Sequence, residues 1–360
     1  MAKKAPRKAS APLLGPVSLE EARALAGGPA PARAPVKGAG IAAATPQSVE
    51  KERERLRAQR ALEDRERIRN YKATMTIMKE RGVKGLPDEE ADTADESAPP
   101  RRRAPGPARA AARPLQILAE GDSWFDYPVP FFGGGIIKRL ETRLGIPILN
   151  LAKAGDEVRY MLGVDERRQL IKQLRDGCPA GGPWEVMLFS GGGNDIVDNP
   201  MVLWLRQYQG GVPAKQLINQ PRYDIALALV RAAYEDLIAL RDALSPTTHL
   251  FFHAYDFAIP DGRGVCGKGP WLKPSLDMKG VPANSPVAAG IVKEMLMQFA
   301  TMMENLEGRH PLVTVINGQG TLAPVTNSWH NELHPSKAGF NQFADLFHAK
   351  LKAAYPGRVL

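Results

Sequence analysis

Four residues of types suited to acyl chemistry stand where apolar stretches end or a helical stretch begins. Ser123, Gly155 and Asn194 each lie just past an apolar run, and His334 precedes the last helical pattern. A serine hydroxyl becomes an effective nucleophile when a neighbouring base, often a histidine, removes its proton. The charge that develops on the substrate oxygen needs donors already aimed at it, such as backbone N–H groups or an asparagine amide. Residues of these types, if the fold brings them together, could supply the nucleophile, the base and the oxyanion donors of an acyl transfer.

The order of these residues resembles the four sequence blocks of the SGNH (GDSL-type) hydrolases. The first block reads Gly121-Asp122-Ser123-Trp124, and the last reads Asn331-Glu332-Leu333-His334-Pro335. The resemblance covers roughly residues 114–354. It implies a serine esterase that hydrolyses carboxylic esters through an acyl-enzyme, with no metal or cofactor. Its small-molecule substrates would carry short acyl or O-acetyl groups on a lipid or a carbohydrate.

The same resemblance implies a role for each residue. Ser123 is the expected nucleophile and His334 the expected base. The expected oxyanion hole combines the backbone N–H groups of Ser123 and Gly155 with the side-chain amide of Asn194. Asp122 is expected to brace the loop around the serine.

The position three residues before His334 departs from the family pattern. The family usually has an aspartate there, and this chain has Asn331. An amide oxygen can orient the imidazole but cannot stabilise the imidazolium by charge, and such a change lowers turnover about 10⁴-fold in a serine protease. Three interpretations stay open: Asn331 completes the catalytic set, a carboxylate such as Glu332 or Asp256 takes part, or the protein is a weak or inactive member that binds an ester or glycan.

Two long segments follow predicted strands and are expected to shape the substrate site. Residues 197–221 include Trp204, and residues 255–286 begin beside Asp256. Long ordered loops in compact domains are often functional lids. We expect Trp204, Asp256 and the nearby His253 to line the substrate site, with a purely structural role as the alternative for His253.

From residue 114 onward, apolar runs alternate with helical patterns. The predicted strands are 115–119, 147–151, 185–190, 248–254 and 311–316. The predicted helices are 134–144, 164–176, 222–244, 287–306 and 336–353. Several strands are continuously hydrophobic, which indicates burial on both faces and a parallel sheet between helices. The sequence thus predicts an α/β fold, a three-layer αβα sandwich with a mostly parallel five-stranded sheet. The SGNH resemblance implies the same flavodoxin-like fold.

The charge of the chain is concentrated before residue 114. Residues 1–113 hold 24 Lys or Arg and 15 Asp or Glu, whereas residues 114–360 hold 24 of each. We expect 1–113 to be a basic, largely disordered tail and 114–360 to be the hydrolase domain. Electrostatic contact of the tail with nucleic acid, an anionic membrane or an acidic protein is possible, so an adaptor function is an alternative. Deletion of the tail is expected to leave kcat/KM within about threefold.

One charged helix is expected within the tail, near 45–82, with Thr45 as its cap and Pro46 in its first turn. Its dense charges of mixed sign favour a solvated single helix. Docking on the hydrolase domain or self-association are the open alternatives, because Tyr71, Met75 and Met78 gather in its second half.

The first residues are basic but are followed by no apolar core of the length that a secretory signal needs, and no apolar run is long enough for a transmembrane segment. Cys178 and Cys266 have no metal-site spacing and are expected to be unpaired thiols. A cytoplasmic location is therefore expected, with organelle targeting or non-classical export left open.

Overall fold

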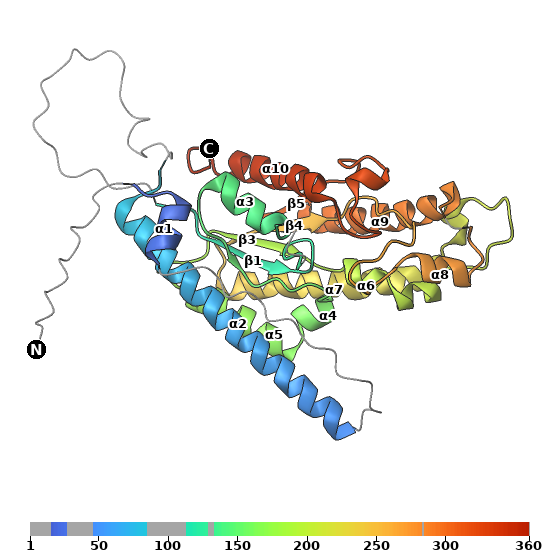
Figure 1. Cartoon of the computed structure of the whole chain (residues 1–360), viewed down its shortest axis with the longest axis horizontal. Helices are drawn as coiled ribbons and strands as arrows, with labels where there is room; N and C mark the ends of the chain where they lie inside the picture. The colour runs from blue at the N-terminus through green and yellow to red at the C-terminus, as the bar shows by residue number, and fades with distance from the viewer. Residues whose placement is uncertain (1–15, 27–45, 85–112, 129–132, 283, 360) are drawn as a thin grey trace, which may run out of the picture.

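The computed structural model describes residues 16–26, 46–84, 113–128, 133–282 and 284–359, and shows a five-stranded sheet at the centre of the chain (Figure 1). The strands are β1 (Ile117–Gly121), β2 (Leu149–Asn150), β3 (Val186–Ser190), β4 (His249–Ala254) and β5 (Val313–Asn317). Their order is β2-β1-β3-β4-β5, and every pair is parallel. The predicted parallel five-stranded sheet is confirmed.

Helices cover both faces of this sheet, as the predicted sandwich requires. The longer ones are α3 (Ile136–Leu144), α5 (Val164–Asp176), α7 (Gln220–Leu244), α9 (Pro286–Glu307) and α10 (Lys337–Ala354). In Figure 1, α3 and α10 lie together on one side of the sheet, with α5 and α7 on the other. Helix α9 packs against α7 and against β4 and β5. Each of these helices overlaps one that the sequence predicts.

Short helical segments that the sequence did not predict join these elements. They are α4 (Val158–Met161), α6 (Gly193–Ile196), α8 (Lys273–Met278), and the 3₁₀ turns η3 (Asn199–Trp204), η4 (Ala214–Leu217) and η5 (Thr326–Ser328). Two of them, α6 and η3, follow β3 directly and lie at the carboxyl end of the sheet.

The sheet topology fixes where a site can form. Strand β1 pairs with β2 on one side and with β3 on the other, so the strand order reverses at β1. In open α/β sheets, ligands bind beyond the carboxyl ends of the strands at this point. Ser123 follows the end of β1, and Asn194 follows the end of β3.

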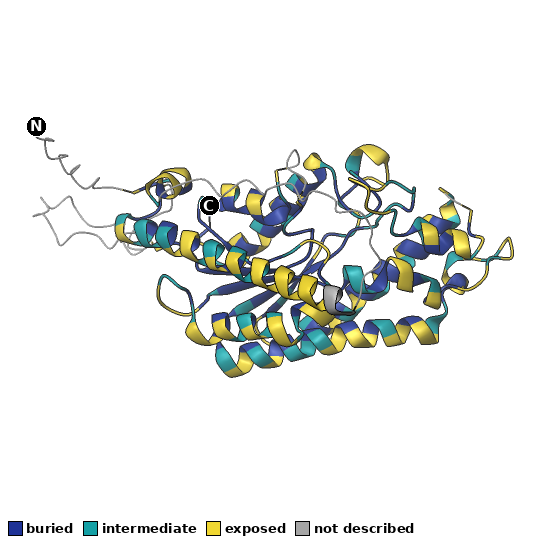
Figure 2. Cartoon of the chain, turned by 60° about the horizontal axis from the view of Figure 1, so that its bottom comes forward, coloured by how far each residue is buried: buried dark blue, intermediate teal, exposed yellow. Residues whose placement is uncertain are grey.

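The charged helix α2 (Pro46–Arg81) packs on the sheet domain, which corrects the expectation of a solvated single helix. Tyr71, Met75 and Met78 are buried, and Tyr71 stacks obliquely on Trp184 with 5.6 Å between ring centroids. Figure 2 shows exposed residues along the outer side of this helix. The helix covers the edge strand β2, whose outer backbone groups would otherwise be open to pairing.

A second correction concerns the predicted disorder of the basic tail, because residues 19–25 form the helix α1 (Leu19–Leu25). Ser18 and Glu21 make a reciprocal capping box, and Leu19 and Ala22 are buried. Arg23 pairs with Glu141 of α3 at 2.6 Å. The rest of the predicted tail, residues 1–15, 27–45 and 85–112, lies outside the described residues.

Two further expectations concern thiols and membrane spans. Both cysteines are free thiols, Cys178 buried and Cys266 exposed, as predicted. In the described part of the chain, no helix combines the length and the apolar character that crossing a membrane requires.

Candidate functional site

Ser123 lies in a tight loop directly after β1, and buried hydrogen bonds fix this loop. The Asp122 carboxylate accepts hydrogen bonds from the Trp124 backbone N–H at 3.0 Å, from Tyr255 Oη at 2.6 Å and from Ser190 Oγ at 3.2 Å. Burial raises the pKa of Asp122 to about 7. Asp122 therefore ties the serine loop to β3 and to the end of β4, in agreement with its predicted bracing role.

A hydrogen-bonded chain runs from the serine through the histidine to the asparagine. Ser123 Oγ lies 2.6 Å from His334 Nε2, and His334 Nδ1 lies 2.9 Å from Asn331 Oδ1. All three side chains are buried. The amide oxygen accepts the Nδ1 hydrogen, so Nε2 is the nitrogen free to accept the serine proton. The structure thus brings the three predicted catalytic residues together.

Tyr127 and His330, which the sequence analysis missed, fix the orientation of the Asn331 amide. Asn331 Nδ2 donates to Tyr127 Oη at 3.1 Å, so Oδ1 is the atom that faces His334. Tyr127 Oη lies 2.6 Å from His330 Nδ1, and the Tyr127 ring stacks on His334 with 4.5 Å between centroids. No motif marks these residues; only the fold places Tyr127 beside a segment some two hundred positions later.

The structure decides between the carboxylates considered as partners for His334. Glu332 is buried and accepts backbone N–H groups of Gly262 at 2.9 Å, Leu272 at 2.8 Å and Lys273 at 3.0 Å. It holds the 255–286 segment in place. Asp256 accepts backbone N–H groups of Phe257, Gly320 and Leu322. Both carboxylates are used for loop anchoring, and the group bonded to His334 Nδ1 is the amide of Asn331.

The environment of His334 strongly favours its neutral form. Burial, with a smaller contribution from His330, lowers the pKa of His334 to about 3. Neutral imidazole is the form that can accept the serine proton, so the base is ready over a wide pH range. The same burial disfavours the imidazolium that forms after proton transfer. His334 is therefore held neutral, and its protonated form is disfavoured.

Asn194 and Gly155 occupy different positions relative to Ser123. Asn194 lines the same cavity as Ser123 and His334, and its Nδ2 donates to the Asp156 carbonyl at 2.9 Å. Gly155 lies one residue before Asp156 in the exposed turn after β2, with φ of 87°, a conformation that favours glycine. Gly155 is not among the residues that line the cavity.

The cavity beside Ser123 is small and mostly apolar. Its volume is about 40 Å³. Its polar edge is formed by Ser123, Asn194 and His334, and its wall by apolar side chains of α9 and neighbouring segments, including Met201, Leu272, Val292, Met295, Leu296 and Leu333. Residues from both predicted lid segments, 197–221 and 255–286, contribute to this wall, as expected.

Of the three side chains expected to line the substrate site, only Asp256 lines the cavity beside Ser123. His253 is fully buried beneath the loop, with Nδ1 3.0 Å from Ser190 Oγ and its ring 4.9 Å from that of Trp124. Burial lowers the pKa of His253 to about 3. Trp204 is also buried and packs near Tyr223, away from the cavity lining. Neither His253 nor Trp204 therefore lines this cavity, and the burial of His253 agrees with the structural role given as its alternative.

No protein-family model and no curated protein matches the sequence. Solved structures do match it. A lipase from a goat rumen metagenome is 16% identical, with a TM-score of 0.42, over 65% of this chain and 96% of its own. An extracellular lipase from Streptomyces rimosus is 13% identical, with a TM-score of 0.40, over 65% of this chain and 99% of its own.

A member of the lipolytic protein G-D-S-L family from Veillonella parvula is 15% identical, with a TM-score of 0.36, over 68% of this chain and 100% of its own. The function of this chain is inferred from its own residues and distances.

Proposed function

We propose that the protein is a serine esterase that hydrolyses small carboxylic esters through an acyl-enzyme on Ser123. The observation that carries this proposal is the hydrogen-bonded chain in which Ser123 Oγ lies 2.6 Å from His334 Nε2 and Asn331 orients the other ring nitrogen. A nucleophile within hydrogen-bond reach of a base, with the base oriented by a third group, is the arrangement that activates a serine.

The proposed reaction has two steps, acylation of Ser123 and deacylation by water. Ser123 Oγ attacks the ester carbonyl carbon while its proton passes to His334 Nε2, and His334 returns that proton to the departing alcohol. A water molecule then attacks the acyl-serine carbonyl while its proton passes to His334 Nε2. The bond to Oγ breaks, His334 returns the proton to Ser123 Oγ, and the carboxylic acid is released. The Asn331 amide keeps the imidazole in the required tautomer throughout.

The oxyanion of each tetrahedral intermediate needs neutral donors beside Ser123. Asn194 Nδ2 carries two hydrogens, and its bond to the Asp156 carbonyl uses one, so the other remains for a substrate oxygen. The backbone N–H groups of Ser123 and Gly155 are the other proposed donors, with Gly155 placed outside the cavity lining at the end of an adjoining turn. Removal of one such donor typically lowers kcat about 10²- to 10³-fold.

The cavity size predicts a preference for short acyl groups. A volume of about 40 Å³ accommodates a short chain, since one water needs roughly 10–15 Å³ of such space. We expect kcat/KM for the p-nitrophenyl esters of acetate, propionate or butyrate to exceed that for octanoate by at least about 10-fold. Hydrolysis of this ester series, measured by release of p-nitrophenol, tests both the proposed activity and its acyl preference.

A matched pair of variants assigns the preference to the cavity. Val292→Ala removes two methyl groups from the cavity wall and should move the optimum toward longer acyl chains. Val287→Ala, on the same helix but outside the wall, should leave it unchanged. Faster hydrolysis of octanoate than of acetate by the wild type would contradict this acyl-pocket assignment.

Asn331→Asp should raise the pKa of His334 and leave the plateau rate unchanged or higher. A carboxylate beside Nδ1 favours the imidazolium by charge, and Tyr127 Oη is placed to donate to its second oxygen. Wild-type His334 stays neutral until the pH falls toward about 3. The fall of wild-type kcat/KM at acid pH, the acid limb of its pH profile, should therefore lie well below pH 6.5. In the variant, His334 is protonated at higher pH, so the acid limb should move up by at least about one unit.

The measurement is the pH dependence of kcat/KM for both proteins between the limits of their stability. Asn331→Gln serves as the control, because it keeps a neutral amide and should not raise the acid limb. A folded Asn331→Asp protein with a large loss of activity at pH 7 and an unmoved acid limb would show that the site requires the neutral amide. An inactive wild type made active by Asn331→Asp would favour the alternative of a binding protein that has lost its enzyme activity.

A further inference from the structure

Helix α2 contacts both loops that the proposed reaction uses. Arg67 Nη1 donates to the carbonyl oxygens of Asn150 at 2.8 Å and Ala152 at 3.2 Å, at the start of the segment that leads to Gly155. Arg67 Nη2 donates to Asp126 Oδ2 at 2.8 Å, three residues beyond Ser123. One guanidinium thus joins the nucleophile loop to the segment 150–156, which we call the oxyanion segment.

Two more side chains on the same face of α2 hold the oxyanion segment. Arg60 pairs with Asp156 at 3.1 Å and with Glu166 at 3.0 Å. Asp64 pairs with Lys153 at 3.2 Å. The spacing of these helix residues, four and then three positions, places them in one row. Asp156 and Asp64 are almost wholly buried. The Lys153–Asp64 pair is therefore well shielded from solvent, whereas 40% of the Arg60 side chain is exposed.

The oxyanion segment is held from the sheet side as well. The Leu151 and Lys153 backbone N–H groups donate to the carbonyl oxygens of Ala119 at 2.8 Å and Gly121 at 2.9 Å. Asn194 then bonds the Asp156 carbonyl. The exposed Gly155 has no side chain of its own to fix it, so the direction of its N–H depends on these neighbouring anchors, of which α2 supplies the outer ones.

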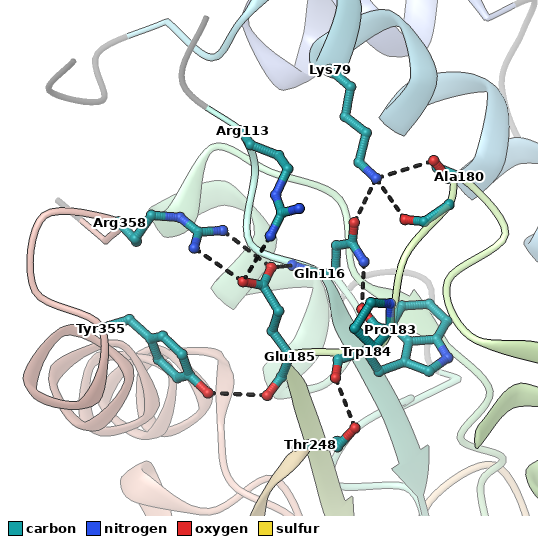
Figure 3. Close-up of polar contacts among 11 residues, drawn as sticks. Lys79, Arg113, Gln116, Ala180, Pro183, Trp184, Glu185, Thr248, Tyr355 and Arg358 are labelled. Atoms are coloured by element: carbon teal, nitrogen blue, oxygen red, sulfur yellow. Dashed lines mark hydrogen bonds and ion pairs between the residues drawn. The ribbon is translucent and has the colours of Figure 1, made fainter. Parts of the chain in front are cut away.

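Helix α2 is itself fixed at its far end, so it can act as a rigid support. Figure 3 shows Lys79 reaching the side chain of Gln116 and the Ala180 carbonyl, next to a cluster around Glu185. In that cluster Arg113 and Arg358 both pair with Glu185. These anchors lie at the amino ends of β1 and β3, opposite the proposed site. Between the two ends of the contact, Tyr71, Met75 and Met78 are buried.

We propose that Arg67 is a positioning residue of the proposed esterase. It fixes the position of the oxyanion segment relative to the Ser123 loop, and Arg60 holds the same segment at Asp156. This inference rests on the proposed function. Arginine suits the task because its planar fork serves three acceptors in fixed directions, which a lysine ammonium on a flexible stem does not. A shift of about 1 Å in such a donor can cost about 100-fold in rate.

The test compares Arg67→Met with Arg69→Met in the full-length protein. Arg69 is on the same helix, its side chain is 75% exposed, and its ion pair is with Glu66 of α2 itself. We expect Arg67→Met to lower kcat on p-nitrophenyl acetate about 10- to 100-fold with KM within about threefold, because the lost interaction acts in the transition state. Arg69→Met should leave kcat within about twofold of wild type, and Arg67→Lys should recover part of the loss.

A double-mutant cycle separates positioning from a merely structural role. Arg67 and Asn194 share no direct contact among the described hydrogen bonds, so independent effects would multiply. If Arg67 acts through the oxyanion hole, Arg67→Met should lower kcat much less in an Asn194→Ala background than in the wild type. Thermal unfolding of each variant shows whether the assay temperature lies below its transition.

Each outcome decides the inference. Unchanged kcat in folded Arg67→Met, or effects of Arg67→Met and Asn194→Ala that simply multiply, would overturn it while leaving a Ser123-dependent esterase intact. Hydrolysis that does not depend on Ser123 would overturn the proposed function and this inference together. If Arg67→Met does not fold, Arg67→Lys and Arg60→Met are used in the same cycle. Effects on kcat that multiply with that of Asn194→Ala for both variants would overturn the inference. A smaller effect of either variant in the Asn194→Ala background would support it.

Discussion

Ser123→Ala is expected to abolish ester hydrolysis by this protein, with kcat on p-nitrophenyl acetate falling at least about 1,000-fold. The reason is that no acyl-enzyme can form without Oγ, which lies 2.6 Å from the base. The cavity wall and the oxyanion donors stay in place in this variant, so KM should change little. The loss should therefore appear in kcat, measured with purified protein across a range of substrate concentrations.

The control is Ser328→Ala, which removes a hydroxyl from a turn, η5, outside the hydrogen-bonded chain of the site. The circular dichroism spectra and the thermal unfolding transitions of both variants should match those of the wild type. A folded Ser123→Ala protein that keeps full activity would show that the nucleophile is elsewhere, and the assignment of His334 and Asn331 would lose its basis.

Deletion of residues 1–113 is expected to lower kcat/KM at least about 10-fold or to prevent folding, contrary to what the sequence alone suggests. The deletion removes α2, whose Tyr71, Met75 and Met78 are buried on the sheet domain. Burial of such side chains contributes about 1.5–3 kcal/mol each, a large part of the 5–15 kcal/mol that stabilises a typical domain. It also removes Arg60 and Arg67 from the oxyanion segment.

Deletion of residues 1–15, which keeps α1 and α2, is the matched control and should leave kcat/KM within about threefold. Both proteins are compared by steady-state kinetics and thermal unfolding. We propose from the docking of α2 that the catalytic unit begins at or before Pro46. A folded 114–360 protein with wild-type kcat/KM would instead place the boundary at residue 114, as the charge distribution suggests.

The sheet and the positions of the proposed catalytic residues were predictable because their signals are local. Stretches such as residues 186–189 are continuously apolar, and a parallel sheet is the structure that buries such strands on both faces. Ser123, Asn194 and His334 each follow or precede an element that the sequence marks. The topology then brings these positions to one edge of the sheet.

Most of the remaining features depend on contacts that leave no local signal. Arg60, Asp64 and Arg67 look like residues of a solvated helix, because an ionic docking face has the same composition as an exposed one. His253 lies in a strand that is buried on both faces, so its position in the sequence does not indicate which face it occupies. Helix α1 had a signal, the Ser18 and Glu21 capping box, but Ala- and Pro-rich surroundings concealed it.

The most direct test of a nucleophilic serine here is labelling of the full-length protein with a fluorophosphonate, followed by peptide mapping. Such a probe forms a covalent bond with a serine only when a neighbouring base activates the hydroxyl. The expected result is one modified residue, Ser123, with no labelling in Ser123→Ala and much slower labelling in His334→Ala. Labelling at another residue, or none under conditions in which the protein hydrolyses p-nitrophenyl acetate, would contradict the proposal that Ser123 and His334 form a catalytic pair.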